Sequence, residues 1–157
     1  MKLIAVCLFA ACCYSLASAI ITNGPDTTYQ RKKLEEVLRQ LYDVKEIMQH
    51  NEKMLSTPPE NIEDCCCLSA LQCFKANMEV HFNTTERNQK KLLKSLKSHL
   101  TVSKAGLNFC NSESQMSTCQ TCDSHPQVTV QVFLNRLESL IQRVSAFAVI
   151  IIIDTFL

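Results

Sequence analysis

Cysteine content is the feature that most constrains this chain, because 10 of its 157 residues are Cys and only 2 are Gly. Cys65, Cys66 and Cys67 precede Cys73, and a separate Cys119-Gln120-Thr121-Cys122 motif lies well downstream. So few glycines exclude a GxGxxG dinucleotide-binding loop and the many turns of a β-sandwich. The composition therefore favours a small helical protein in which the cysteines have a structural or chemical role.

Residues 1–19 have the features of a secretory signal peptide. Lys2 supplies a basic start, an apolar run extends to Leu16, and Ala17-Ser18-Ala19 forms a small-residue cleavage pattern. The apolar run is shorter than the ~20 residues that a membrane-spanning helix needs. We therefore expect residues 20–157 to be one secreted domain without membrane insertion, exposed to an oxidising medium in which thiols form disulfides.

The spacing of apolar residues predicts an all-α fold of four helices. The predicted ranges are about Tyr29 to Met54, Thr57 to Phe82, Glu86 to Leu100, and Val130 to Phe147. Thr57 can cap the second helix, with Pro58 at its first helical position. The polar stretch from Thr101 to Gln127 is long enough to join parallel helices, as in up-up-down-down bundles. Alternation of Val128, Val130 and Val132 leaves a short strand open as an alternative at the start of the last helix.

Two of the cysteines on the second predicted helix share a face. Cys73 follows Cys66 by seven positions, and seven steps of a helix return to within about 20° of the starting direction. The helical rise between them is about 10 Å, which an extended Cys119-x-x-Cys122 motif can match. We therefore expect two disulfides between the helix and this motif, and the spacing alone permits either order of pairing.

Three mature cysteines remain, namely Cys65, Cys67 and Cys110, and a further bridge from the helix to Cys110 is left open. The motif at Cys119 and Cys122 also admits a redox dithiol or half of a zinc site. A thioredoxin-like dithiol needs a strand–helix context, and the four histidines have no ligand spacing that would complete a zinc site. The sequence therefore predicts no metal, no cofactor and no catalytic residues.

Three segments, together with Pro59-Glu60-Asn61-Ile62-Glu63 just upstream of the first, carry a resemblance to a known family. They are Cys66-Cys67-Leu68-Ser69-Ala70-Leu71-Gln72-Cys73-Phe74, Cys119-Gln120-Thr121-Cys122-Asp123-Ser124, and Phe133-Leu134-Asn135-Arg136-Leu137-Glu138-Ser139-Leu140-Ile141-Gln142. The chain resembles the interleukin-2/15/21 family of short-chain four-helix cytokines, and the second and third segments favour its interleukin-21 branch. The resemblance implies a disulfide-stapled, up-up-down-down bundle in which Cys66 pairs with Cys119 and Cys73 pairs with Cys122.

The resemblance also implies a function. A member of this family is a monomeric, secreted class I cytokine that binds a private receptor chain and the common gamma chain. It thereby triggers Janus kinase/STAT signalling in lymphocytes. By motif match, the implied receptor-binding residues are Arg39, Gln40, Asp43, Lys94, Lys97 and Gln142.

The third predicted helix carries basic residues with no acidic residue among them: Arg87, Lys90, Lys91, Lys94 and Lys97. A solvated helix face accounts for this pattern by itself. With the resemblance, we expect this face to steer an acidic receptor surface towards the chain. The formal net charge of the whole chain is only +1, which gives no reason to expect nucleic acid as the main partner.

Asn83-Thr84-Thr85 is an N-glycosylation sequon in the predicted turn between the second and third helices. Other functions remain open beside the leading hypothesis. One is a sibling cytokine similar to interleukin-15 or interleukin-2. A second is a secreted thiol oxidoreductase that uses Cys119 and Cys122. A third is a precursor of a membrane-active peptide based on the basic third helix.

Overall fold

The computed structural model describes residues 25–98 and 119–154. In these ranges the chain forms four α-helices: α2 (Pro25–Ile47), α3 (Cys67–His81), α4 (Arg87–Leu96) and α7 (Val130–Asp154). Two short strands, β1 (Met54–Ser56) and β2 (Gln127–Thr129), and two 3₁₀ turns, η1 (Asp64–Cys66) and η2 (Cys122–Ser124), complete the described elements. The expected helical character is confirmed, and the two strands add a small sheet to it, with β2 next to the start of the last helix, where the sequence left a short strand open.

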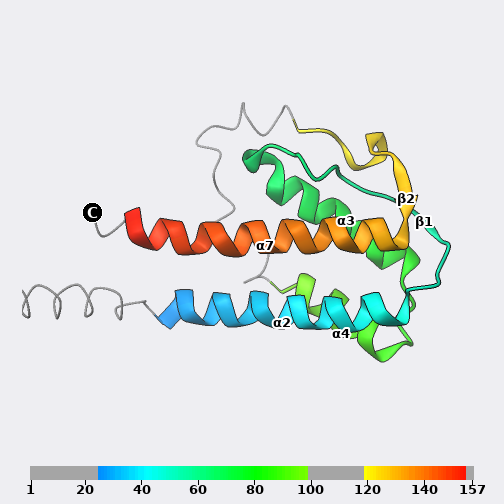
Figure 1. Ribbon diagram of the computed structural model, residues 1–157, viewed down its shortest axis with the longest axis horizontal. Helices are drawn as coiled ribbons and strands as arrows, with labels where there is room; N and C mark the ends of the chain where they lie inside the picture. The colour runs from blue at the N-terminus through cyan, green and yellow to red at the C-terminus, as the bar shows by residue number, and fades with distance from the viewer. Residues whose placement is uncertain (1–24, 99–118, 155–157) are drawn as a thin grey trace, which may run out of the picture.

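Helices α2 and α7 lie side by side and run in opposite directions, with α3 and α4 behind them in the same view (Figure 1). An ion pair of 2.6 Å between Lys45 Nζ and Glu138 Oε2 joins α2 to α7. Helix α4 packs against both α2 and α3, and α3 also packs against α7. The described chain is therefore a small helical bundle.

The two strands pair the connection after α2 with the connection before α7. They are antiparallel, with Leu55 opposite Val128. The backbone N–H of Val130 donates to the carbonyl oxygen of Lys53 at 2.9 Å and extends this pairing to the start of α7. Leu55 is fully buried. The sheet thus holds two loops that are distant in sequence against one end of the bundle.

The first helix ends earlier than predicted, at Ile47 rather than near Met54. The side chain of Asn51 accepts a hydrogen bond from the N–H of Lys53 at 2.9 Å, which supports a turn in place of further helix. Met54 then lies in β1. The buried side chain of Leu55 and the backbone bonds to β2 outweigh the helical periodicity there.

The second helix begins later than predicted, and its expected cap at Thr57 is wrong. Thr57 is buried, and its N–H donates to the carbonyl oxygen of Pro126 at 3.2 Å instead of starting a helix. The chain enters α3 through η1, so that Cys66 becomes the residue that precedes the α-helix. The non-helical segment 57–63, which contains a turn at Glu60 and Asn61, takes the place of the first two predicted turns.

The third and fourth helices begin close to their predicted positions. The carboxylate of Glu86 caps α4 by accepting hydrogen bonds from the N–H groups of Asn88 and Gln89, at 3.1 Å and 2.8 Å. Helix α4 ends at Leu96, and the predicted end at Leu100 lies outside the described residues. Helix α7 begins at Val130 as predicted and continues to Asp154, beyond the predicted end at Phe147.

Aliphatic and aromatic side chains from all four helices and β1 form one core. At its centre the rings of Phe74 and Phe133 meet edge to face, with 5.0 Å between centroids. Phe82 adds a further ring at 6.3 Å from Phe133. Full burial of each large apolar side chain contributes about 1.5–3 kcal/mol to folding, so this contact between α3 and α7 stabilises the bundle.

Among the described helices, none has both the length and the apolar character of a membrane span.

Candidate functional site

Two disulfides fasten the loop before α7 to α3. Cys66 is bonded to Cys119, and Cys73 to Cys122, with Cα–Cα distances of 5.5 Å and 5.3 Å. Of the two pairing orders that the spacing permits, this is the one that the family resemblance implies. Each cysteine of the Cys119-x-x-Cys122 motif is therefore joined to a different turn of the α3 region rather than to the other.

The hydroxyl of Ser56 reinforces the same loop. It lies 3.2 Å from the carbonyl oxygen of Cys122 and 2.9 Å from that of His125, so it can donate to either. Together with the disulfides, this contact fixes the path of the chain from Cys119 into β2. The helix surfaces on either side of the loop are consequently held in one relative position.

Two further cysteines lie beside the first disulfide. The sulfur of Cys65 is 4.0 Å from that of Cys66 and 3.8 Å from a carboxylate oxygen of Glu63. Cys67 is fully buried in the core. Cys110 lies outside the described residues, so a third bridge to it stays a prediction.

The sulfurs of Cys65, Cys66 and Cys119 lie within 4.8 Å of one another, which is close enough to hold a metal ion. Two of these sulfurs, however, belong to one disulfide. A disulfide sulfur is not the thiolate that zinc binds. This cluster is therefore a disulfide with a neighbouring cysteine, and its chemistry does not fit a zinc centre.

The basic residues of α4 and of its C-cap all lie on the exposed side: Arg87, Lys90, Lys91, Lys94 and Lys97. Leu92, Leu93 and Leu96 are buried on the opposite side. We call the exposed set the basic face. Lys97 also forms an ion pair of 2.9 Å with Glu79 of α3, and its hydrogen bond lowers the pKa of Glu79. Lys94 and Lys97 both reach solvent, but part of the charge of Lys97 is already compensated.

The three residues singled out on α2 differ in exposure. Arg39 and Asp43 are exposed. Gln40 is only 7% exposed, and its amide nitrogen donates to Glu36 at 3.1 Å. Arg39 and Asp43 are therefore available to a partner, whereas the side chain of Gln40 offers it almost no surface.

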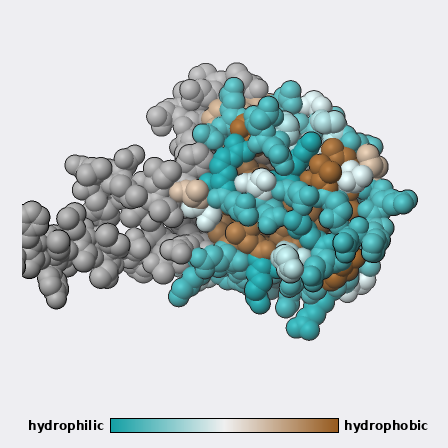
Figure 2. All heavy atoms as spheres, in the orientation of Figure 1, coloured by the Kyte–Doolittle hydropathy of each residue, from teal (hydrophilic) through white to brown (hydrophobic). Residues whose placement is uncertain are grey.

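Helix α7 presents an uncharged stripe to solvent. Over residues 130–146, the part of α7 whose side chains are described, the exposed positions recur at steps of three and four residues and comprise Val132, Asn135, Ser139, Gln142 and Ala146. Gln142 thus lies on a polar but neutral surface, unlike the residues of the basic face. In the view of Figure 2, hydrophilic side chains cover most of the surface, and apolar side chains show as separate patches between them.

Two arginines of α7 that the sequence analysis did not single out hold the segment 57–63. Arg143 donates to the carbonyl oxygens of Ile62 and Glu60, at 2.9 Å and 2.7 Å. Arg136 donates to the carbonyl oxygen of Pro58 at 3.4 Å. The spacing of seven residues between the arginines places both on one side of α7, and this spacing is the signal that could have revealed them.

The predicted sequon lies on an exposed turn between α3 and α4. Asn83 is exposed, and its side-chain oxygen accepts hydrogen bonds from the N–H and the hydroxyl of Thr85, at 3.0 Å and 2.7 Å. The backbone N–H of Asn83 donates to Gln89 at 2.7 Å. A glycan on the Asn83 amide nitrogen would therefore extend into solvent.

The exposed residues that the sequence predicted as receptor contacts thus fall into three regions: the basic face of α4, the pair Arg39 and Asp43 on α2, and the neutral stripe of α7. Helix α2 contacts both α4 and α7.

No protein-family model matches the sequence.

Proposed function

We propose that this chain is a secreted class I helical cytokine similar to interleukin-21. In this proposal it binds a private receptor chain and the common gamma chain and triggers Janus kinase/STAT signalling in lymphocytes. The observation that carries the proposal is the pair of bonds Cys66–Cys119 and Cys73–Cys122 across a small helical bundle. This is the cross-linking that the resemblance implies, and we take the helices to follow the up-up-down-down order of that family.

Each proposed receptor contact has a different electrostatic character. The basic face of α4, with Arg39 and Asp43 of α2, would bind the private chain. Positive charge at the rim of an interface raises the association rate with an acidic partner. The neutral stripe around Gln142 would bind the common gamma chain through polar and apolar contacts. A monomer with two such unlike surfaces brings two different receptor chains together, which is the event that activates their associated kinases.

The disulfides support a structural role for the Cys119-x-x-Cys122 motif in this proposal. Each cysteine of the motif is bonded to the α3 region, and disulfides of this kind are typical of small extracellular domains. They keep the loop before α7 in place and so preserve the relation between α7 and the helices that it packs on. We therefore favour a binding protein over a thiol oxidoreductase.

Binding of the full secreted chain to immobilised receptor ectodomains tests the proposal. The private chains for interleukin-21, interleukin-15 and interleukin-2 are compared side by side, each with and without the common gamma chain. We expect binding to the interleukin-21 private chain and phosphorylation of STAT proteins in responsive lymphocytes. Preference for another private chain would move the assignment to that sibling, and binding to none would refute the proposal.

Charge reversal on α4 tests which surface is used. Lys94→Glu should slow association with the private chain several-fold at low salt, and added salt should reduce the difference. Lys75→Glu on α3 changes the net charge equally and serves as the matched control, because Lys75 lies outside the proposed contacts. Equal slowing by both variants would show that overall charge, and not the basic face, controls binding.

A further inference from the structure

Most cations of the basic face have no acidic partner among the described residues. Lys97 alone forms an ion pair there, with Glu79 of α3. The nearby carboxylate of Glu86 accepts hydrogen bonds from the first N–H groups of α4 and is therefore directed towards the end of the helix. The basic face thus presents positive charge to solvent that the rest of the described chain leaves largely uncompensated.

The charges of the basic face form a row along the axis of α4. They recur at steps of three and four residues, and the interval from Arg87 to Lys97 corresponds to about 15 Å of helical rise. Like charges at these steps repel one another and destabilise a helix. A linear polyanion with regularly repeated charges would relieve this repulsion along the whole row.

The composition of the basic face does not suit the centre of a protein–protein interface. Such centres are rich in aromatic and apolar anchors and poor in lysine. Among the described residues, the large exposed apolar side chains belong to α2, α3, β1 and α7, and none belongs to α4. The lysines can therefore steer a receptor from the rim of an interface, as proposed above, but they do not supply its apolar centre.

The same helix separates the classes of polyanion. Anionic membranes bind amphipathic helices whose apolar residues enter the lipid, but Leu92, Leu93 and Leu96 are buried in the bundle. Single-stranded nucleic acid is held by bases that stack on aromatic side chains, and α4 has no aromatic residue. A sulfated polysaccharide needs neither feature, because it carries fixed negative charges on a hydrophilic chain.

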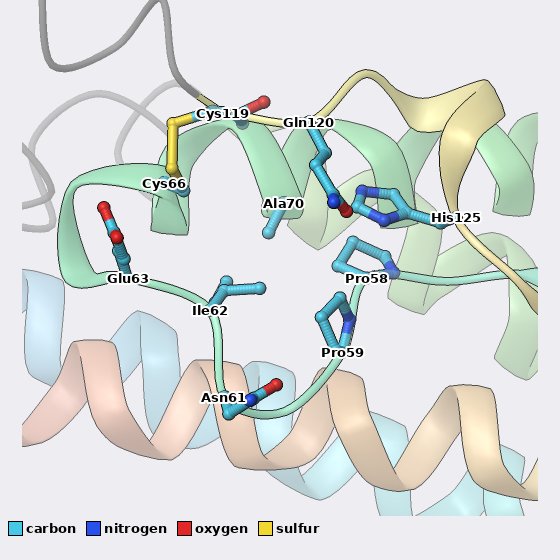
Figure 3. Close-up of a pocket in the computed structure, with 11 residues that line it drawn as sticks. Pro58, Pro59, Asn61, Ile62, Glu63, Cys66, Ala70, Cys119, Gln120 and His125 are labelled. Atoms are coloured by element: carbon cyan, nitrogen blue, oxygen red, sulfur yellow. A yellow bond between two sulfur atoms is a disulfide. The ribbon is translucent and has the colours of Figure 1, made fainter.

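Two other features of the described chain suit a polyanion less well. The cavity beside the Cys66–Cys119 disulfide has the carboxylate of Glu63 in its wall, and its lining includes no lysine or arginine among the described residues (Figure 3). On α2, Lys33 is compensated by an ion pair of 3.2 Å with Glu36. The basic face of α4 is therefore the favoured site for a polyanion.

We propose that the basic face binds a sulfated polysaccharide outside the cell, with sulfate groups lying along α4 in contact with the lysine ammonium groups. Such binding would retain the secreted chain close to the surface or matrix that carries the polysaccharide. The proposal goes beyond the receptor function and does not depend on it, because binding to the polysaccharide is measured without any receptor.

Titration of the full, disulfide-bonded chain with a heparin dodecasaccharide at several salt concentrations tests the proposal. Each neutralised charge releases counterions, so a plot of the logarithm of the association constant against the logarithm of the salt concentration should have a slope of about −3. Hyaluronan of the same length, which has carboxylates but no sulfate groups, and oligothymidylate should each bind at least about tenfold more weakly at physiological salt. Binding of either as tight as that of heparin would overturn the assignment to a sulfated chain.

Removal of two charges from the middle of the row tests the location of the site. Lys90→Gln with Lys94→Gln should weaken heparin binding at least about tenfold and should reduce the magnitude of the slope by about one for each lysine. Lys32→Gln with Lys33→Gln removes two charges from α2 and is the matched control, with a much smaller expected effect. Equal losses in the two double variants would overturn the proposal, because net charge alone would then control binding.

Chemical labelling of the unsubstituted chain covers the case in which these variants fail to fold. Lysine acetylation is measured by mass spectrometry with and without saturating heparin. Heparin should protect Lys90, Lys91 and Lys94 from acetylation and should leave Lys32 accessible. Absence of saturable heparin binding, or acetylation of Lys90 and Lys94 that heparin does not reduce, would overturn the proposal.

Discussion

The guanidinium of Arg143 donates a hydrogen bond to the carbonyl oxygen of Ile62 at 2.9 Å, which ties α7 to the non-helical segment before α3. The same side chain donates to the carbonyl oxygen of Glu60 at 2.7 Å and lies 3.5 Å from the carboxylate of Asp64. One side chain of α7 thus satisfies backbone groups that a helix over the same residues would have satisfied internally. This contact helps to explain why segment 57–63 does not join the helix.

Arg143→Met should lower the free energy of unfolding by about 1–2 kcal/mol, because two charge-assisted hydrogen bonds to backbone carbonyls are lost. Arg136→Met is the matched control on the same side of α7, and its single hydrogen bond of 3.4 Å predicts a smaller loss. Urea denaturation of both variants measures the difference. A loss for Arg136→Met equal to or larger than that for Arg143→Met would contradict this account.

Removal of the disulfides should show a specific pattern of non-additivity. With the Cys73–Cys122 bond present, the Cys66–Cys119 bond closes only a short additional ring, so Cys66→Ala with Cys119→Ala should cost about 3 kcal/mol. The opposite pair of substitutions, Cys73→Ala with Cys122→Ala, should lower the free energy of unfolding by about the same amount. Loss of both bonds also opens a loop of 49 residues, so it should cost more than twice as much as loss of either.

Denaturant unfolding of the three cysteine variants measures these costs. Reduction of the unsubstituted chain should reproduce the result for loss of both bonds, which controls for packing changes caused by the alanines. An unchanged denaturation midpoint after loss of either single bond would contradict the prediction.

The helices could be predicted from the sequence where their apolar stripe faces the core. In α7, Phe133, Leu137 and Ile141 are all fully buried and recur at helical spacing. The start of α3 could not be predicted in the same way, because Thr57 and Pro58 form a good local helix cap. Contacts with Pro126 and Arg136, which are distant in sequence, determine the structure there instead.

The candidate site was predictable to a similar extent. The lysines of α4 lie opposite a leucine stripe, so their exposure follows from helical spacing. Gln40 also has a polar side chain, but its place between helices buries it, and a single sequence gives no sign of this packing. The environment of His125 depends on segments that precede it by more than 50 residues, so a single sequence gives no sign of it.

Gln142→Asp should weaken binding to the common gamma chain at least about tenfold, because a charge in the neutral stripe of α7 loses its hydration when the interface forms. Gln142 is exposed, so the free energy of unfolding should change by less than about 0.5 kcal/mol. Gln72→Asp introduces the same charge at an exposed position of α3 and is the matched control. Receptor activation by Gln142→Asp equal to that of the unsubstituted chain would disprove the role of Gln142.

Asn83 should carry an N-linked glycan when the chain is secreted from a eukaryotic cell. Its exposed turn and the contact with the Thr85 hydroxyl place the sequon where a glycan meets no obstruction. Treatment with an N-glycosidase should lower the apparent mass, and Asn83→Gln and Thr85→Ala should both remove this shift. Thr85→Ser retains a sequon and should retain the glycan, whereas a mass shift that persists in Asn83→Gln would point to a different site.

His125 should make the chain less stable as the medium becomes acidic. Burial lowers the pKa of His125 in the folded state below its ordinary value of 6.5. The unfolded chain therefore binds the proton first, so the free energy of unfolding falls as the pH falls from above 6.5 towards the folded-state pKa. Replacement by leucine removes this contribution, and the stability of His125→Leu should depend less on pH in that window. Urea denaturation at several pH values, with His50→Leu as the control, measures the difference between the variants, and parallel curves for all three proteins would show that His125 does not titrate differently on folding.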